Sequence, residues 1–437
     1  MVRQYVKDFL KKINIKILSL QLMQIIRTAS VFAISIFMAQ YCKDITVISH
    51  YETLFLVGTG LSFFWVSGLM TTFLPFYYER PESKQGIVIF SAFFSLFILS
   101  FFSAFLILLA GILFFKEMSW YLFASYAVYI FFNSPAFLIE YIFLAKNKNR
   151  LILYYAFIAF ALQVVVFCTV IFLTDSLLAG IISLAVYAFV KFVFLIVILV
   201  KYADLHLDFE VIRKYMLKSS PIILSLLIGG SSDYVSSFIV RYFSSESEFA
   251  IYRYGAREFP LTRILANSLS VIMSGEIAFA IKKENMHQSL LDLKKSATRL
   301  MHIVFPLTFI LLFTSKYLFS FFYTSTFESS YEIFNILLML IVTRTIFPQS
   351  VLMGLQRTDL IFKASVIEFL SNLILGALLV YLIGVRGAAI AIVASYYINT
   401  AILWFSVHRR GVKVSEYANV KLWISYSLLG WIVLLIN

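Results

Sequence analysis

The sequence predicts an all-α, polytopic membrane protein with two six-helix lobes around a central cavity and an extra C-terminal helix. Three observations support this fold class: the apolar composition, a series of apolar runs long enough to cross a bilayer, and a charge difference between alternate loops. Of the 437 residues, 61% are hydrophobic and 14% are charged, whereas soluble domains average about 45–50% and about 25%. This composition excludes a soluble enzyme, a disordered chain and a secreted disulfide scaffold.

Apolar runs of the length that a membrane-spanning helix needs, about 20 residues, follow one another along the chain. Charged, Pro/Gly or Asn-containing breaks separate twelve such runs, and a shorter thirteenth run ends the sequence. We therefore predict an N-terminal lobe at 1–210, a C-terminal lobe at 211–410 and an appendage at 411–437. The predicted spans are 17–41, 51–76, 86–114, 119–144, 151–174, 177–200, 220–243, 249–279, 298–322, 331–355, 360–383, 387–407 and 422–436.

Lys and Arg residues gather in every second loop. One set of loops, with the adjoining span ends, holds 25 of the 36 Lys and Arg residues, and the opposite set holds 4. Because Lys and Arg collect in the cytoplasmic loops of membrane proteins, this alternation places the N-terminus in the cytoplasm. It also explains the net charge of +13, which in a soluble protein would suggest nucleic acid. We therefore expect membrane lipids, and no nucleic acid, as partners.

The two predicted lobes share a weak sequence similarity. At an offset of 201 residues, five positions in and near the first span meet identical residues in and near the seventh. The pairs are Ser30–Ser231, Ser35–Ser236, Phe37–Phe238, Tyr41–Tyr242 and Tyr51–Tyr252. Composition alone explains such matches equally well in a chain rich in Phe and Tyr, but the division into six and six spans requires the same alignment. Lobes with an even number of spans share one orientation, and parallel repeats of this kind are a transporter design.

Charged side chains inside the predicted spans are the candidate functional residues. An ionisable group near the bilayer centre is costly, so it faces a cavity or a partner. Seven basic groups and three acids lie deep in the predicted spans. The predicted substrate-binding residues are Arg27, Arg253, Arg257, Arg263 and Arg344, and the predicted coupling or charge-tuning residues are Asp233, Glu258 and Glu368.

A cavity with more basic than acidic groups is electropositive, and a low dielectric strengthens its field. We therefore expect an anionic cargo, and Arg suits phosphate because its planar donors bind oxygens in pairs. Structural interpretations stay open beside this one. Arg253 can snorkel outward, Arg257 can pair with Glu258, and Lys191 can pack among Phe side chains. Asp233 is either the ion partner of an arginine or a proton-binding site.

The sequence lacks the motifs of an enzyme or a cofactor site. It contains no GxxxxGK[ST] stretch, and its five His residues are scattered without metal-ligand spacing. No Ser–His–Asp set lies in a suitable loop. We therefore expect no enzymatic activity, no cofactor and no metal site.

The stretch FAIYRYGAREFPL contains Arg253, Gly255, Arg257, Glu258 and Pro260. In this stretch, its span layout and its basic interior, the chain resembles bacterial oligosaccharide-lipid flippases. These are polysaccharide transporters of the multidrug/oligosaccharidyl-lipid/polysaccharide exporter superfamily. The resemblance implies a V-shaped pair of lobes around a cationic cavity. It implies that undecaprenyl-diphosphate-linked oligosaccharide, such as an O-antigen repeat unit, is carried across the bacterial inner membrane by alternating access. We expect this transport to be coupled to a proton or sodium ion. The thirteenth span departs from the family's even count.

Three alternatives to this function accompany it. A cation-coupled multidrug exporter of the same fold would need acids that face the cavity. A membrane O-antigen polymerase or glycosyltransferase would need a long outer loop, which the sequence lacks. A lipid II flippase of the same superfamily would differ only in its cargo.

Overall fold

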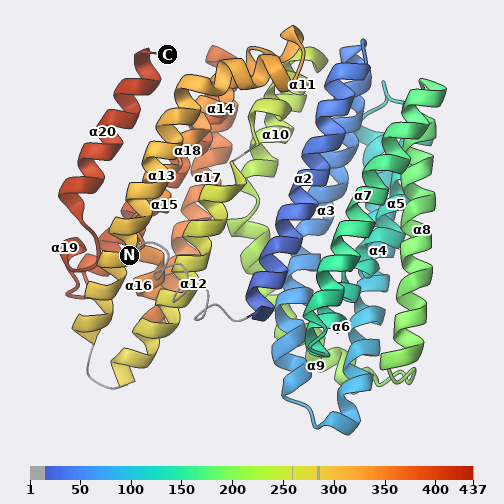
Figure 1. Ribbon diagram of the computed structural model, residues 1–437, viewed down its shortest axis with the longest axis horizontal. Coiled ribbons are helices and arrows are strands. Elements are labelled where there is room, and N and C mark those ends of the chain that lie inside the picture. The colour runs from blue at the N-terminus through green and yellow to red at the C-terminus, as the bar shows by residue number, and fades with distance from the viewer. Residues whose placement is uncertain (1–14, 258, 283–285, 437) are drawn as a thin grey trace. The chain divides into compact units, whose positions relative to one another are not determined.

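The computed structural model describes residues 15–257, 259–282 and 286–436. These residues form helices joined by short connections and contain no strand (Figure 1). The chain divides into two compact units, Met1–Leu227 (unit 1) and Ile228–Asn437 (unit 2). The division falls near the end of α9 (Phe209–Gly229) rather than at residue 210, and the segment predicted as an appendage is grouped with unit 2.

The chain is a multi-pass membrane protein. Within the described ranges, nine helices are long and apolar enough to cross a membrane, or up to eleven if each of two bent helix pairs is one span. The bent pairs lie where the sequence predicts spans 220–243 and 331–355. The predicted span 249–279 is not among the eleven. It forms two helices, α11 (Glu246–Gly255) and α12 (Pro260–Lys282), because proline favours the first position of a helix and disfavours a helical residue before it.

Unit 1 is a bundle in which helices that are distant in sequence pack together. α2 packs on α7, α3 on α4, α4 on α5, and α5 and α7 both pack on α8 (Figure 1). The fourth span is interrupted at Phe137, so it consists of two helices. The helices of unit 1 are α2 (Ile15–Tyr41), α3 (Ile45–Tyr78), α4 (Gln85–Phe114), α5 (Trp120–Ala136), α6 (Leu138–Ala145), α7 (Asn149–Thr174), α8 (Leu177–Tyr202) and α9, with a 3-10 turn at Glu82–Lys84.

Unit 2 repeats the same packing scheme. Its first span, α10, packs on its fifth, α17; its second, α12, packs on its third, α13; and its fourth and fifth both pack on its sixth, α18. This agreement supports the repeated six-helix plan. Besides α11 and α12, the helices of unit 2 are α10 (Ser232–Phe243), α13 (Met286–Phe322), α14 (Ser330–Leu338), α15 (Ile341–Arg344), α16 (Pro348–Gly354), α17 (Thr358–Ile383), α18 (Val385–His408), α19 (Val414–Tyr417) and α20 (Val420–Ile436), with a 3-10 turn at Ser325–Phe327.

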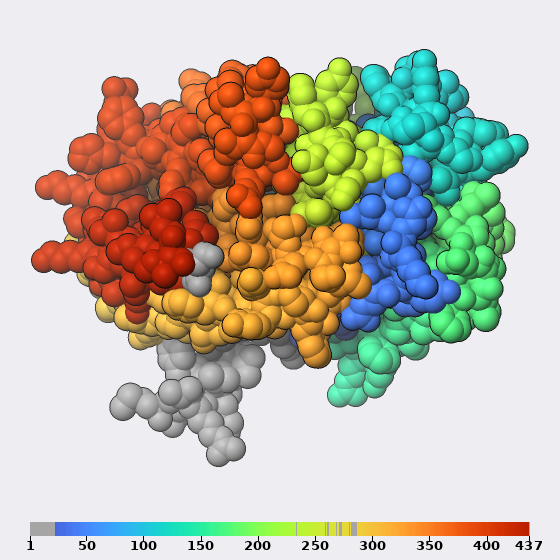
Figure 2. Space-filling view, turned by 90° about the horizontal axis from the view of Figure 1, so that it is seen from above, coloured from blue at the N-terminus to red at the C-terminus, as the bar shows by residue number. Residues whose placement is uncertain are grey.

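α20 corresponds to the predicted thirteenth span. It is a short apolar helix that packs on α13 at the periphery of unit 2, as the space-filling view shows (Figure 2). Tyr426 stacks on Phe305 with ring centroids 5.0 Å apart, and its hydroxyl lies 2.9 Å from His302 Nδ1. Leu435 is 82% exposed, so the outer face of this helix is apolar and suited to lipid.

α4 shows how these helices distribute small and large side chains. Its exposed face carries Phe101, Phe102 and Phe105, each more than half exposed. Its buried face carries four serines, Ser91, Ser95, Ser100 and Ser103. Small residues let helices approach closely inside a membrane. Large apolar side chains can face lipid there, because lipid tails are as apolar as the protein interior. Three of these hydroxyls donate to carbonyls one turn earlier, which satisfies them without water.

Candidate functional site

Two charged side chains from different helices meet inside unit 1. Arg27 Nη2 lies 2.6 Å from each carboxylate oxygen of Glu140. The Glu140 side chain is 3% exposed and the Arg27 side chain 28%. The Arg27 guanidinium also lies over the rings of Phe137, at 4.5 Å, and Phe160, at 5.3 Å. This contact joins α2 to α6 and α7, and Arg27 and Glu140 are 113 residues apart in sequence.

A second cation lies beside this pair. Lys191 Nζ donates to Asn133 Oδ1 at 2.9 Å and lies over the rings of Phe160 and Tyr187, at 5.8 and 5.5 Å. Within the described residues it forms no ion pair with a carboxylate, although Glu140 acts on it electrostatically. We call Arg27, Asn133, Glu140 and Lys191 the unit 1 charge cluster. With two cations and one carboxylate in their usual charged states, the cluster has one net positive charge.

A local irregularity in the fourth span lies beside Glu140. Pro135 lies inside α5 and cannot donate a backbone hydrogen bond, and the helix ends one residue later. Glu140 then falls in the first turn of α6, where the helix dipole favours a negative charge.

The unit 1 charge cluster lies away from the ends of helices that are long and apolar enough to cross a membrane. Glu140 is five residues from the end of α6 at Ala145, and Lys191 is eleven from the end of α8 at Tyr202. With a rise of about 1.5 Å per residue, these positions lie roughly 8 and 17 Å inside the helix ends. The hydrocarbon core is about 30 Å thick, so both groups are within the spans.

Unit 2 contains a buried cluster of polar side chains around Glu368, which is 2% exposed. Ser232 Oγ donates to Glu368 Oε1 at 3.2 Å, and Asn399 Nδ2 donates to Oε2. Asn372 Nδ2 donates to the Ser232 carbonyl at 2.7 Å, and Ser236 Oγ donates to Asn372 Oδ1 at 3.0 Å. We call these five residues the unit 2 polar cluster. It links α10, α17 and α18 through buried hydrogen bonds.

Two of the predicted arginines lie at and just after the end of α11. Arg253 Nη1 donates to Ser237 Oγ at 3.2 Å. The Arg257 guanidinium lies over the Tyr254 ring at 5.2 Å. Glu258, a predicted coupling or charge-tuning residue, lies outside the described residues.

The two remaining arginines lie on different helices of unit 2. Arg344 ends α15 and lies over the Tyr396 ring at 5.5 Å, and Arg263 is exposed on α12. The backbone of Asp233 belongs to α10, and its side chain is outside the described residues. Arg27 belongs to unit 1 and the other four predicted arginines to unit 2, so their convergence on one cavity stays a prediction.

Sequence reasoning did not identify several residues of these clusters. Glu140 lies near the end of the predicted span 119–144 and was not among the candidate residues, and neither were Asn133, Asn372 or Asn399. One signal was available, because Asn372 follows Glu368 by four residues and therefore lies on the same face of α17. Within the described residues, no group of three or more His, Cys, Asp or Glu side chains could hold a metal ion.

Comparison with known proteins identifies the fold. No family model and no curated protein sequence matches the chain. Among solved structures, the chain is similar to the lipid II flippase MurJ in an inward closed conformation, with 19% identity and a TM-score of 0.67 over 95% of this chain and 92% of that one. It is also similar to an inward-facing multidrug resistance MATE family transporter of the MOP superfamily, with 12% identity and a TM-score of 0.65 over 89% and 94%.

A third similar structure is a MOP superfamily transporter from Pyrococcus furiosus, described by the reversed polarity of its binding pocket. It shares 13% identity, with a TM-score of 0.61 over 91% of this chain and 94% of that one. The protein therefore has the fold of the MOP superfamily transporters, as the sequence predicted for its fold class.

Proposed function

We propose that the protein is a flippase for an anionic, lipid-linked saccharide in the bacterial inner membrane. The observation that carries this proposal is the unit 1 charge cluster, which keeps one net positive charge within helices that are long and apolar enough to cross a membrane. Such a charge attracts anions and repels cations in a medium of low dielectric. The cargo that combines anionic oxygens with a long apolar tail is undecaprenyl-diphosphate-linked oligosaccharide, from O-antigen or another surface polysaccharide. The fold shared with a lipid II flippase supports this assignment.

Glu140 acts in this proposal as a resident counter-ion. Without cargo it neutralises Arg27, which makes the buried guanidinium tolerable. When the diphosphate arrives, its oxygens replace the carboxylate at Arg27 and accept a hydrogen bond from Lys191. The competition between carboxylate and diphosphate keeps binding reversible. The polyprenyl tail stays in lipid while the lobes alternate between inward-open and outward-open states.

The remaining predicted residues take supporting roles. Arg253, Arg257, Arg263 and Arg344 contribute positive charge for the cargo from unit 2. Glu368, with Asp233 and Glu258, provides the coupling group that binds a proton or a sodium ion. The burial of Glu368 inside a predicted span supports this role, because ionisable residues within membrane spans mark ion pathways and proton relays.

Glu368 also favours a second candidate function, a cation-coupled multidrug exporter of the same fold. Such a protein uses a buried carboxylate for a cation, and two MATE-type structures share the fold. The two functions predict different cargo charge. Uptake of a cationic dye into inverted vesicles would favour the exporter, and its absence together with flipping of an anionic lipid would favour the flippase.

The proposal can be tested in proteoliposomes that contain a fluorescent undecaprenyl-diphosphate-linked oligosaccharide. A membrane-impermeant quencher reports how much of the lipid lies in the outer leaflet. Lys191→Gln removes the net positive charge of the unit 1 charge cluster, and we expect the flipping rate to fall by about 10- to 100-fold, the value of a hydrogen bond to a charged group. Arg263→Glu and Arg344→Glu test the contribution of unit 2 in the same assay.

Lys316→Gln is the matched control. Lys316 is 58% exposed and pairs with Glu328 at 3.3 Å near the end of α13, far from either cluster in sequence. Lys316→Gln removes the same charge as Lys191→Gln. An equal loss of flipping in both variants would show that the effect comes from overall charge. Undiminished flipping in Lys191→Gln would contradict the assignment of the unit 1 charge cluster to the cargo.

A further inference from the structure

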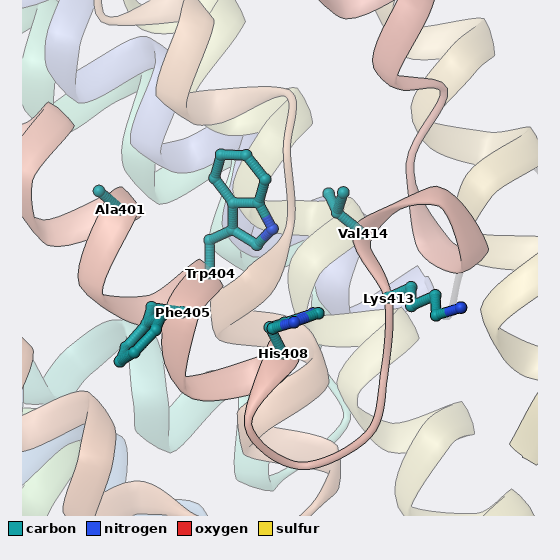
Figure 3. Close-up of a pocket in the computed structure, with 6 residues that line it drawn as sticks. All are labelled: Ala401, Trp404, Phe405, His408, Lys413 and Val414. Carbon is teal, nitrogen blue, oxygen red and sulfur yellow. The ribbon is translucent and has the colours of Figure 1, made fainter.

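A hollow lies beside the last turns of α18. Its volume is about 400 Å³, within the range of roughly 300–1,000 Å³ that is usual for ligand pockets. The residues that line it are Ala401, Trp404, Phe405, His408, Lys413 and Val414 (Figure 3). The hollow belongs wholly to unit 2, and neither polar cluster contributes to its wall.

A chain reversal forms the hollow. α18 ends at His408, and Gly411 has φ 81°, a conformation that side chains with a Cβ rarely adopt. The chain then returns so that Val414 faces Trp404 across the open space (Figure 3). Lys294 Nζ donates to the Ser415 carbonyl at 2.7 Å, which ties the returning segment to α13. The wall is therefore held by the fold and does not depend on a ligand.

The lining of the hollow is mainly apolar, and Trp404 and Phe405 are 38% and 54% exposed. Two basic residues, His408 and Lys413, lie at its edge. The Arg409 guanidinium lies over the Phe405 ring at 4.4 Å, which places a second permanent charge at the rim.

The cations at this rim keep their charge available. Within the described residues, neither Arg409 nor Lys413 forms an ion pair with a carboxylate. The adjacent acid, Glu416, accepts a hydrogen bond from the backbone N–H of Lys413 at 2.8 Å rather than from its ammonium group. The hollow thus offers positive charge to an outside anion.

The position of the hollow matches the membrane interface. α18 has 24 residues, so its length is about 36 Å and exceeds the hydrocarbon core of about 30 Å. Its last turn therefore reaches the headgroups, and Trp404, one turn earlier, has the place where Trp is enriched in membrane proteins. The charge distribution of the loops predicts that this is the cytoplasmic end.

We propose that this hollow binds one anionic phospholipid from the surrounding leaflet. An acyl chain lies against Trp404 and Ala401, and the phosphate accepts hydrogen bonds from Lys413 and from His408, with Arg409 at the rim. Charge complementarity selects an anionic over a zwitterionic headgroup, because within the described residues neither Lys413 nor Arg409 is ion-paired, and the nearby Glu416 carboxylate accepts from the Lys413 backbone N–H instead. The proposal is independent of the cargo of the protein.

Native mass spectrometry of the purified full chain tests it. The protein is equilibrated in detergent with equal amounts of dioleoyl phosphatidylglycerol and dioleoyl phosphatidylcholine, which differ in headgroup charge and share their acyl chains. We expect one phosphatidylglycerol to be retained in preference. Lys413→Gln lowers the retention ratio about fivefold and Lys413→Gln/Arg409→Gln about 25-fold, since each cation near a membrane surface contributes a factor of about five.

Arg410→Gln is the matched control, because Arg410 is exposed in the same turn and does not line the hollow. Ala401→Trp fills the apolar part of the hollow and should lower retention of the bound lipid without a change of charge. Equal retention of the two lipids by the unchanged protein would overturn the proposal, as would an equal effect of Arg410→Gln and Lys413→Gln, or full retention by Ala401→Trp. Thermal unfolding of each variant verifies that it is folded.

Discussion

Substitution of Glu140 by Gln tests how the unit 1 charge cluster is held together. The change removes a charge and keeps the size of the side chain, so Arg27 loses its ion partner and Lys191 loses a nearby negative charge. Loss of one partner of a buried ion pair costs ~3–5 kcal/mol. Arg27 is 28% exposed and Gln retains an acceptor, so we expect the lower limit, about 3 kcal/mol. For a unit of this size, the unfolding midpoint would fall by roughly 6–12 °C.

The measurement is a double-mutant cycle by thermal unfolding in detergent, with Arg27→Gln, Glu140→Gln and both changes together. The double variant should be more stable than Glu140→Gln alone, because it no longer contains the cation that the carboxylate served. The exposed pair of Lys316 and Glu328 provides the reference cycle, with an expected coupling of ~0.2–1 kcal/mol. Effects of Arg27→Gln and Glu140→Gln that add within about 0.5 kcal/mol would refute the interpretation of a coupled pair.

Three further predictions concern single positions. Asp44→Ala removes the side chain that caps α3 and should cost about 1 kcal/mol. The capping hydrogen bond lowers the Asp44 pKa. The stabilisation is therefore present above the unfolded pKa of about 3.9 and is lost as the pH falls through the folded pKa. A series of unfolding midpoints at different pH values measures this loss. Gly384 has φ 68° and ψ −153°, so Gly384→Ala should lower the free energy of unfolding by ~1–3 kcal/mol. Gly275 lies in a helix with nothing within 4 Å of the new methyl group. Gly275→Ala should therefore be neutral or stabilising in the same unfolding assay. Asn399→Leu removes a donor to the buried Glu368 carboxylate and should destabilise unit 2 by ~1–3 kcal/mol; an unchanged midpoint would contradict the hydrogen bond.

Hydropathy predicts most of the spans because length and apolar content are local properties. It is less successful where a segment contains charge and helix breakers together. The predicted span 249–279 forms two helices that end and begin at Gly255 and Pro260, and the fourth span is interrupted at Phe137. A window average cannot show such breaks, because the apolar residues on both sides dominate it.

The candidate site is less predictable than the fold, since it depends on which helices are neighbours. Arg27 is identified in the sequence by the cost of a charge in lipid. Its partner, Glu140, lies 113 residues away, and only the packing of the first, fourth and fifth spans brings the two together. The same applies to Asn399, which reaches Glu368 from the next helix. Sequence thus predicts which groups need a partner, and tertiary packing determines the partner.

Lys191→Met separates a structural role of the unit 1 charge cluster from a binding role. Lys191 bonds an amide and two aromatic faces rather than a carboxylate, so an apolar side chain of similar volume removes the cost of placing a charge among apolar groups. A cation retained at such a cost serves function at the expense of stability. We therefore expect Lys191→Met to keep or raise the unfolding midpoint while it abolishes flipping in proteoliposomes. A variant with a lowered midpoint and normal flipping would make Lys191 a structural residue.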